Sequence, residues 1–346
     1  MNVNEIREKS RSVIGPYCKS CPVCNGKACS NKIPGTGAKG TGTVAIKNYD
    51  AWQKIEVKMD TLAENKEIDT TFKMFGKSFK YPIFAGPVGA VSQHYSDLYN
   101  DNSFNEIYVR ACAKSGIAAF TGDGLNEEIM IHATHAIKEN NGIGVPTIKP
   151  WDKDTCFKKL DLANESNAFA IAMDIDAAGL PFLQGRIPPA GRKSVEEVKE
   201  IIDYAHVPFI VKGIMSVEGA QKAVDAGAKA IVVSNHGGRV LDGTPATACV
   251  LEEIADQFKG QVKIIVDGGI RSGLDVFKAL ALGADAVIIA RPFVNMIYGG
   301  KDEGVEAYVQ QLGQELENAM NDKEVGVILL TERFGREFPD LINEIK

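Results

Sequence analysis

The sequence predicts one large (β/α)8 barrel behind an irregular N-terminal segment. From Tyr81 onward, eight short apolar runs alternate with longer segments of amphipathic, helix-like pattern. Most of these runs are apolar throughout, which is typical of parallel strands that helices cover. Eight such units are the number that closes a barrel of this kind. A doubly wound sheet is the alternative, although it typically has fewer strands and a nucleotide-binding loop after the first one.

The predicted strands and helices follow one another along the chain. The strands are YPIFAGPV (81–88), IAAFTGD (117–123), GVPTIKP (144–150), FAIAMDID (169–176), PFIVKGI (208–214), AIVVSNH (230–236), VKIIVDGG (262–269) and AVIIARP (286–292). Between them, Ser194 begins a capping box that Glu197 completes, which indicates the start of a helix. Apolar stripes at helical spacing run through 250–258, 276–280 and 305–316.

The first 79 residues differ in composition from the rest. We predict an N-terminal extension over 1–79 and the barrel over 80–346. Residues 15–43 are rich in Gly, Pro, Cys and Lys and have no sustained period, so we expect irregular structure there. Residues 44–80 are expected to form a helix and a short hairpin that close the bottom of the barrel.

Composition and charge narrow the classes of function. The hydrophobic share of 45% and charged share of 24% are ordinary for a globular protein. The net charge of −6 argues against a nucleic-acid partner, which needs clustered Lys and Arg. No stretch approaches the roughly 18 consecutive apolar residues of a membrane span, and residues 1–15 lack the apolar core of a secretory signal. We therefore expect a cytoplasmic protein with no membrane span.

The motif SNHGGRVLDG follows the sixth predicted strand, at the end of a barrel where active sites lie. His236 has a side chain suited to general-base catalysis. Arg239 offers a planar fork for a carboxylate. An isolated His and Arg would more simply form a loop hydrogen bond and a surface ion pair. Lys212 and Asp267, at neighbouring strand ends, favour an active site instead.

A second motif, DGGIRSG, follows the seventh strand and indicates a phosphate site. Gly268 and Gly269 would allow close backbone approach, and the helix that begins after Ser272 would offer its N-terminal amides to an anion. A tight turn with a capped helix explains the glycines equally well. It does not explain Arg271 and Arg291, which favour the phosphate site.

Lys212-Gly213, SNHGGR, DGGIRSG and ARP together resemble the FMN-dependent α-hydroxy-acid oxidase and dehydrogenase family, which includes glycolate oxidase and lactate oxidase. The resemblance covers roughly residues 80–320 and is strongest over 208–292. DGGIR with KALALGA is shared with other phosphate-binding barrels such as IMP dehydrogenase, whereas SNHGGR is more specific. The resemblance implies an FMN-dependent oxidoreductase that oxidises a 2-hydroxy acid or a related alcohol.

The resemblance also implies roles for individual residues. His236 would take a proton from the substrate, Asp174 would pair with His236, and Arg239 would bind the substrate carboxylate. Lys212 would stabilise the reduced flavin near N1 and O2. The implied cofactor-binding residues are Ala85, Gly86, Pro87 and Val88 against the flavin, Thr121 and Ser234 as hydrogen-bond donors, Asp267 at the ribityl chain, and Gly268, Gly269, Arg271, Ala290 and Arg291 at the phosphate.

Three features depart from the family pattern. The tyrosine that usually ends the third strand is replaced in the stretch Pro146–Lys149. The second substrate arginine is missing from the stretch Asp174–Pro181, and the N-terminal tyrosine is not evident. We infer a divergent member, in which Lys149 and Asp176 are hypothesised to supply the missing polarity.

Four cysteines in the extension have the spacing C-x2-C-x2-C-x4-C: Cys18, Cys21, Cys24 and Cys29. Thiolates at this spacing are able to bind zinc or an iron–sulfur cluster. The alternative is a set of structural or redox-sensitive thiols without metal. The spacing alone does not separate these readings.

The leading hypothesis is oxidation of a 2-hydroxy acid of the lactate or glycolate type. A flavin barrel of another class is the alternative, either an isomerase similar to type 2 isopentenyl-diphosphate isomerase or a phosphate-substrate dehydrogenase. A third hypothesis is a flavin- or metal-binding redox sensor. The expected partners are a small-molecule substrate and an electron-acceptor protein, and the resemblance implies a homo-oligomer, typically a tetramer.

Overall fold

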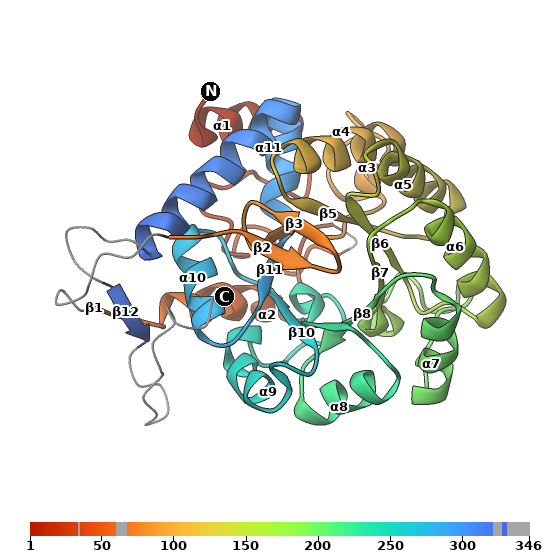
Figure 1. Cartoon of the computed structure of the whole chain (residues 1–346). Coiled ribbons are helices and arrows are strands. Elements are labelled where there is room, and N and C mark those ends of the chain that lie inside the picture. Colours follow the sequence, from red (N-terminus) through yellow and green to blue (C-terminus); the bar gives the residue numbers. More distant parts are fainter. Residues whose placement is uncertain (34, 60–67, 321–326, 331–346) are drawn as a thin grey trace.

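A closed barrel of eight parallel strands forms the centre of the molecule (Figure 1). The computed structural model describes residues 1–33, 35–59, 68–320 and 327–330. The barrel strands are β4 (Ile83–Ala85), β5 (Ala118–Thr121), β6 (Gly144–Ile148), β7 (Ile171–Asp174), β8 (Phe209–Ile214), β9 (Ala230–Val233), β10 (Lys263–Asp267) and β11 (Ala286–Ile289). They are arranged in the order β10-β11-β4-β5-β6-β7-β8-β9. The predicted barrel is confirmed, with each strand inside its predicted range.

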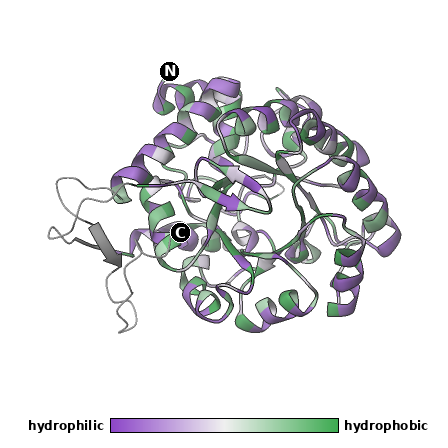
Figure 2. Cartoon of the chain, viewed as in Figure 1, coloured by the Kyte–Doolittle hydropathy of each residue, from purple (hydrophilic) through white to green (hydrophobic). Residues whose placement is uncertain are grey.

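Helices surround the barrel (Figure 1). They are α3 (Val91–His94), α4 (Asp101–Lys114), α5 (Glu127–Glu139), α6 (Lys153–Glu165), α7 (Val195–Tyr204), α8 (Val217–Asp225), α9 (Leu251–Phe258), α10 (Gly273–Ala281) and α11 (Arg291–Met320). Three 3-10 turns interrupt the loops: η1 (Ile175–Gly179), η2 (His236–Gly238) and η3 (Thr247–Cys249). The predicted capping box of Ser194 and Glu197 begins α7. The strands are hydrophobic and the outward faces of the helices hydrophilic (Figure 2), as the sequence pattern predicts.

A hairpin closes the N-terminal end of the barrel, as predicted. Its strands are β2 (Phe72–Met74) and β3 (Lys77–Phe79), which lie across the barrel opening in Figure 1. The ring of Phe79 packs edge-on against Phe84 of β4, with 5.1 Å between centroids. It also contacts Phe169, so the hairpin completes an aromatic cluster that fills this end of the barrel.

The helix α2 (Thr43–Gln53) lies at the opposite end, so the prediction that it helps to close the bottom is wrong. Its Trp52 indole donates to the carbonyl of Gly268, which follows β10, at 2.8 Å. Its Asn48 amide exchanges two hydrogen bonds with the Asn235 amide after β9, at 2.8 and 2.9 Å. These buried polar groups need partners, and the loops at the C-terminal ends of the strands supply them.

The remaining N-terminal elements lie on and beside the barrel. The helix α1 (Val3–Val13) buries Val3 and Ile6 and packs along α11. Residues 15–42, called the strap below, have no helix or strand where the structure describes them, which agrees with the prediction of irregular structure. The strand β1 (Val57–Met59) pairs with β12 (Val327–Leu330). In the ranges that the structure describes, every helix is too short or too polar to cross a membrane.

Candidate active site

A large open cavity lies at the C-terminal ends of the barrel strands. It holds about 1400 Å³ of empty space, including its opening to solvent. Twelve of the residues proposed from the sequence line it: Pro87, Val88, Asp174, Lys212, His236, Arg239, Asp267, Gly268, Gly269, Arg271, Ala290 and Arg291. The strap contributes Gly35 and Thr36 to the wall. The sequence motifs that seemed separate are thus brought to one place.

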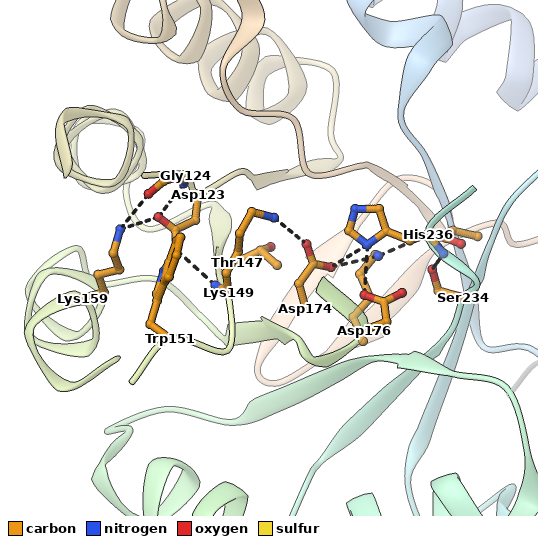
Figure 3. A network of polar contacts seen from close by, with 12 residues as sticks. Asp123, Gly124, Thr147, Lys149, Trp151, Lys159, Asp174, Asp176, Ser234 and His236 are labelled. Atoms are coloured by element: carbon orange, nitrogen blue, oxygen red, sulfur yellow. Dashed lines mark hydrogen bonds and ion pairs between the residues drawn. The ribbon is translucent and has the colours of Figure 1, made fainter. Parts of the chain in front are cut away.

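A buried ion cluster forms the floor of this cavity (Figure 3). The parallel register of β7 and β8 sets Asp174 beside Lys212, and the Lys212 ammonium lies 2.9 Å from the Asp174 carboxylate. Lys149, just after β6, approaches the same carboxylate at 3.4 Å. Burial alone would raise the pKa of Asp174, but the neighbouring charges of Lys212, His236 and Lys149 hold that pKa well below its usual value. Asp174 is therefore ionised at neutral pH.

Burial alone would likewise lower the pKa of Lys212. The surrounding carboxylates of Asp174, Asp176 and Asp267 raise that pKa above its usual value. The side chain is only 2% exposed. The site therefore keeps a permanent positive charge inside the barrel.

His236 is held in a fixed orientation. Its backbone has a φ of 54°, in the left-handed region that a residue with a side chain rarely adopts. Its amide donates to the Ser234 hydroxyl at 3.1 Å. Its Nδ1 lies 2.9 Å from the Asp176 carboxylate and 3.8 Å from Asp174 (Figure 3). Asp176 is thus the nearer partner of His236, and Asp174, the partner that the family resemblance implied, lies farther away but within ion-pair distance.

The turn η1 explains this exchange of partners. It begins directly after β7 and carries Asp176 back over Gly213 of β8. A Cβ atom at Gly213 would lie 2.6 Å from the Cβ of Asp176, so a side chain there would displace this carboxylate. Asp174 is meanwhile occupied by the two lysines. Asp176 was named from the sequence only as a source of replacement polarity, and its position depends on a turn that no local signal specifies.

Arg239 is half-buried at the edge of the cavity. Its guanidinium donates to the main-chain carbonyls of Gly35 and Gly37 in the strap, at 2.5 and 3.2 Å. Burial lowers the pKa of Arg239 to about 10, which leaves the side chain charged at neutral pH. Within the described ranges, no carboxylate lies within ion-pair distance of this arginine. Two main-chain carbonyls leave part of its five-donor fork open to a ligand.

The predicted phosphate cradle combined two arginines with the N-terminal amides of a helix, and the structure treats these two parts differently. Arg271 and Arg291 both line the cavity. The N-terminal amides of α10, in contrast, are already occupied: the amides of Arg271 and Ser272 donate to Asp275, and that of Gly273 donates to Glu315. The helix terminus is therefore not an open anion site, because acidic side chains of the protein already cap it.

Gly268 and Gly269 are also explained differently. Both have a positive φ, of 90° and 87°. A Cβ atom at Gly269 would lie 2.2 Å from the Asn48 carbonyl of α2. These glycines therefore allow α2 to pack against the loop after β10. Both glycines also line the cavity. The backbone contact that requires them is the one with α2.

Four residues proposed for the cofactor site lie in the wall behind the cavity. They are Ala85, Gly86, Thr121 and Ser234, at or just after the ends of β4, β5 and β9. The Gly86 carbonyl accepts from the Tyr108 hydroxyl at 2.6 Å. The hydroxyl of Thr121 is buried without a hydrogen-bond partner among the described residues. The Ser234 hydroxyl accepts from the His236 amide, which uses a lone pair of its oxygen and not its O–H.

A second buried network lies beside the ion cluster and was missed from the sequence. Asp123 accepts from the Trp151 indole at 2.6 Å, from the Lys149 amide at 3.0 Å and from the Lys159 ammonium at 2.5 Å (Figure 3). The network joins three segments of the chain, which contribute Asp123, Trp151 and Lys159. No local sequence motif therefore predicts it. By fixing the backbone of Lys149, Asp123 positions the cation that approaches Asp174.

The four cysteines of the strap are near the phosphate cradle. The Arg271 guanidinium donates to the main-chain carbonyl of Cys24 at 2.7 Å, and Arg291 donates to that of Thr36 at 3.4 Å. Among the described residues, the group that comes closest to metal-ligand spacing is Asp174, Asp176 and His236. No three of the four thiols lie within 4.8 Å of one another.

The fold and the site together define a (β/α)8 barrel with a half-buried histidine–carboxylate pair and a cavity that three arginines line. Residues 35–184 and 188–326 match the family model described as FMN-dependent dehydrogenase, and the chain belongs to that family. The resemblance expected from the sequence is therefore confirmed.

Individual relatives agree with this assignment. An L-lactate oxidase from Lentilactobacillus hilgardii is 50% identical over 125 residues, which are 36% of this chain and 34% of that protein. A peroxisomal (S)-2-hydroxyacid oxidase from Arabidopsis thaliana is 46% identical over 128 residues, 37% of this chain and 34% of that protein. The matched stretch thus spans 34% of the length of each of these curated relatives.

Solved structures match over most of the chain. A structure titled as a lactate oxidase of Pediococcus acidilactici superposes with a TM-score of 0.74 at 28% identity, covering 93% of this chain and 90% of that chain. A mandelate oxidase variant with 2-hydroxy-phenylacetamide gives a TM-score of 0.75 at 25% identity, covering 95% of this chain and 98% of that chain.

FMN is the cofactor that the family implies, and the described residues fit it. Thr121 Oγ1 and Asp267 Oδ1 are buried without hydrogen-bond partners among the described residues, a condition that native proteins rarely tolerate unless a ligand or water fills the gap. Arg271 and Arg291 offer two guanidinium groups to a phosphate. Lys212 places a buried cation between these groups and His236.

Proposed function

We propose that the protein oxidises a small 2-hydroxy acid to the corresponding 2-oxo acid, with bound FMN receiving the two electrons. The observation that carries this proposal is the His236–Asp176 pair, which shares one cavity with Lys212 and Arg239. The relatives named as oxidases of lactate and of 2-hydroxy acids support the same reaction class.

In this proposal His236 acts as the base. Its Nδ1 donates to Asp176, which leaves Nε2 to accept a proton from the substrate. Asp176 then stabilises the imidazolium that forms, because a carboxylate at 2.9 Å favours the positive charge. When bound, FMN supplies the acceptor for the electrons, and Lys212 provides a fixed positive charge for the reduced ring.

Arg239 would bind the substrate carboxylate with the part of its fork that the strap leaves open. Lys149 would provide the second cation, in the stretch where the family usually has a tyrosine. It lines the cavity and is 8% exposed. This arrangement favours a small, compact 2-hydroxy acid, because the substrate would share the cavity with FMN.

The proposed cofactor contacts follow the residues named from the sequence. The flavin would lie against 85–88, with Thr121 and Ser234 behind it, Asp267 at the ribityl chain, and Gly268, Gly269, Arg271, Ala290 and Arg291 around the phosphate. Arg271 and Arg291 would make the main phosphate contacts, since the α10 amides are occupied. An electron-acceptor protein, a homo-oligomer and a cytoplasmic location stay predictions.

An anaerobic absorption spectrum tests the proposal directly. The purified protein, reconstituted with FMN, is mixed with a panel of 2-hydroxy acids, and we expect the flavin bands to bleach with one of them. His236→Ala should retain the flavin spectrum and lose bleaching by about 10²-fold or more in rate. Flavin bands that no 2-hydroxy acid bleaches would favour a flavin isomerase or a phosphate-substrate dehydrogenase, and failure to bind FMN would overturn the proposal.

A further inference from the structure

The four cysteines of the strap converge although they have no regular secondary structure. The thiol of Cys18 is close enough to those of Cys21, Cys24 and Cys29 for their charges to interact, and Cys21 interacts in the same way with Cys24 and Cys29. The Cys18 thiol also contacts the Asn295 amide oxygen of α11 at 3.4 Å. Asn295, Cys24 and Arg271 line one small cavity, so Cys18 and Cys24 both lie at its edge.

Arginines surround this region. The charges of Arg271 and Arg291 interact with the Cys24 thiol. Those of Arg239 and Arg291 interact with the Cys29 thiol. These three guanidinium groups also line the FMN cavity. A negatively charged group held by the four sulfurs would be stabilised by this field.

The spacing of the thiols discriminates between two kinds of metal centre. A single zinc ion with bonds of about 2.3 Å brings its four sulfurs within roughly 4 Å of one another. No three of these thiols meet even a 4.8 Å limit. An iron–sulfur cluster is itself several ångströms across and holds its cysteines farther apart, and C-x2-C-x2-C runs are typical of such centres.

We propose that Cys18, Cys21, Cys24 and Cys29 bind a four-iron iron–sulfur cluster beside the FMN phosphate site. The cluster would lie on the far side of Arg271 from the flavin. Arg271 lines both the FMN cavity and a smaller cavity that Cys24 also lines.

A second step rests on the proposed function. Oxidation of a 2-hydroxy acid releases two electrons and two protons. The reduced flavin would give the electrons to the cluster one at a time, each lowering the cluster charge by one. A one-electron carrier protein would reoxidise the cluster after each step, and the protons would leave to solvent. The chain would then act as a dehydrogenase that is coupled to a carrier.

The cluster is tested by composition before any turnover. The full-length protein is purified anaerobically, incubated with ferrous iron and sulfide, and desalted. We expect four iron and four sulfide per chain, broad absorption near 400 nm that persists after FMN is subtracted, and an electron paramagnetic resonance signal after dithionite. Stoichiometric zinc without iron, or no bound metal after reconstitution, would overturn the proposal.

Variants separate ligation from folding. Cys24→Ser and Cys21→Ser should each lose at least half of the iron, whereas Cys249→Ser, on the exposed turn η3, should keep all of it. Circular dichroism and FMN content monitor folding. Iron content that is equal in all three variants would contradict the assignment of ligands.

The electron route has its own readout. In the loaded protein, a 2-hydroxy acid that bleaches the flavin should also produce the cluster signal that dithionite gives. Bleaching without this signal leaves the cluster and the proposed oxidation intact and overturns the route alone. A dithionite signal in a protein whose flavin no acid bleaches would sustain the cluster and contradict the proposed function.

Discussion

At the scale of single residues, Asp174 is the centre of the site. It lies between two buried lysines, and its negative charge compensates the positive charge of each ammonium group. Removing one member of a buried ion cluster leaves the others uncompensated, which typically costs about 3–5 kcal/mol. Asp174 is thus first a support for Lys149 and Lys212, and only at longer range a neighbour of His236.

Asp174→Asn should lower the free energy of unfolding by about 3 kcal/mol near pH 7. The pKa of Asp174 is lowered in the folded state, so its contribution is complete above the unfolded value of about 4 and disappears as the pH falls below it. The difference between variant and wild type should therefore be constant from about pH 5 to 8 and shrink below pH 4. Urea unfolding at a series of pH values measures this, and a difference that grew in acid would be inconsistent with the ion cluster.

Asp176 should matter more for turnover than for stability. Asp176→Asn should keep FMN and lower kcat by about 10²-fold, because the imidazolium of His236 loses its nearest negative charge. Stopped-flow bleaching of the flavin gives the rate. If Asp174→Asn lowered the rate while Asp176→Asn left it unchanged, the pairing with Asp174 expected from the family would be restored.

A backbone variant examines the same pairing from the other side. Gly213→Ala should displace Asp176 and lower kcat, because the added Cβ has no room beside that carboxylate. Gly243→Ala is the matched control, since Gly243 also has a positive φ but open space around its Cα. An equal decrease in both variants would mean that backbone strain, and not the carboxylate, accounts for the effect, and an unchanged rate in Gly213→Ala would contradict the role of Asp176.

At the scale of elements, the strands were predictable and the placement of one helix was not. Continuous apolar runs bounded by polar strand ends specify buried parallel strands. The pattern of α2 indicates which of its faces is buried but not at which end of the barrel it lies. That choice depends on the pairing of Asn48 with Asn235, which are 187 residues apart. Likewise, the capping box of Ser272 and Asp275 is visible in the sequence, yet Asp275 also accepts from amides that were expected to face the phosphate.

The hairpin offers a test at this scale. Phe79→Ala should lower the free energy of unfolding by about 3–5 kcal/mol, because it opens a cavity in the aromatic cluster at the N-terminal end. Ser78→Ala, on the exposed face of the same strand, should change stability by less than about 0.5 kcal/mol. Chemical unfolding measures both. The bleaching rate of the folded Phe79→Ala protein should match wild type, since the active site lies at the other end.

At the scale of the whole molecule, the family pattern predicted the residues that line the cavity but not the position of the strap beside it. His236, Lys212, Arg271 and Arg291 line one cavity, as expected from the convergence of strand ends in a barrel. The strap contacts Arg239 and Arg291 through main-chain carbonyls. Carbonyl partners leave no trace in the side-chain sequence, so sequence reasoning could not place the strap there.

Cofactor binding should stabilise the whole fold. FMN at 100 times its dissociation constant should raise the free energy of unfolding by about 2.7 kcal/mol, because it binds only the folded state. Arg291→Ala should reduce this gain in proportion to its loss of FMN affinity. Thermal unfolding with and without FMN measures the gain, and an unchanged melting temperature at saturating FMN would contradict the proposed cofactor site.

The strap has a consequence for the order in which the molecule is made. Its contacts with the loop after β9 join residues far apart in the sequence, such as Thr41 and Asp242, which are 201 positions apart. A ribosome therefore releases the cysteines long before their docking surface exists. Throughout that interval the thiols are exposed to the surrounding medium. A metal centre or an oxidised thiol formed in that period would later be packed against the barrel, beside the arginines.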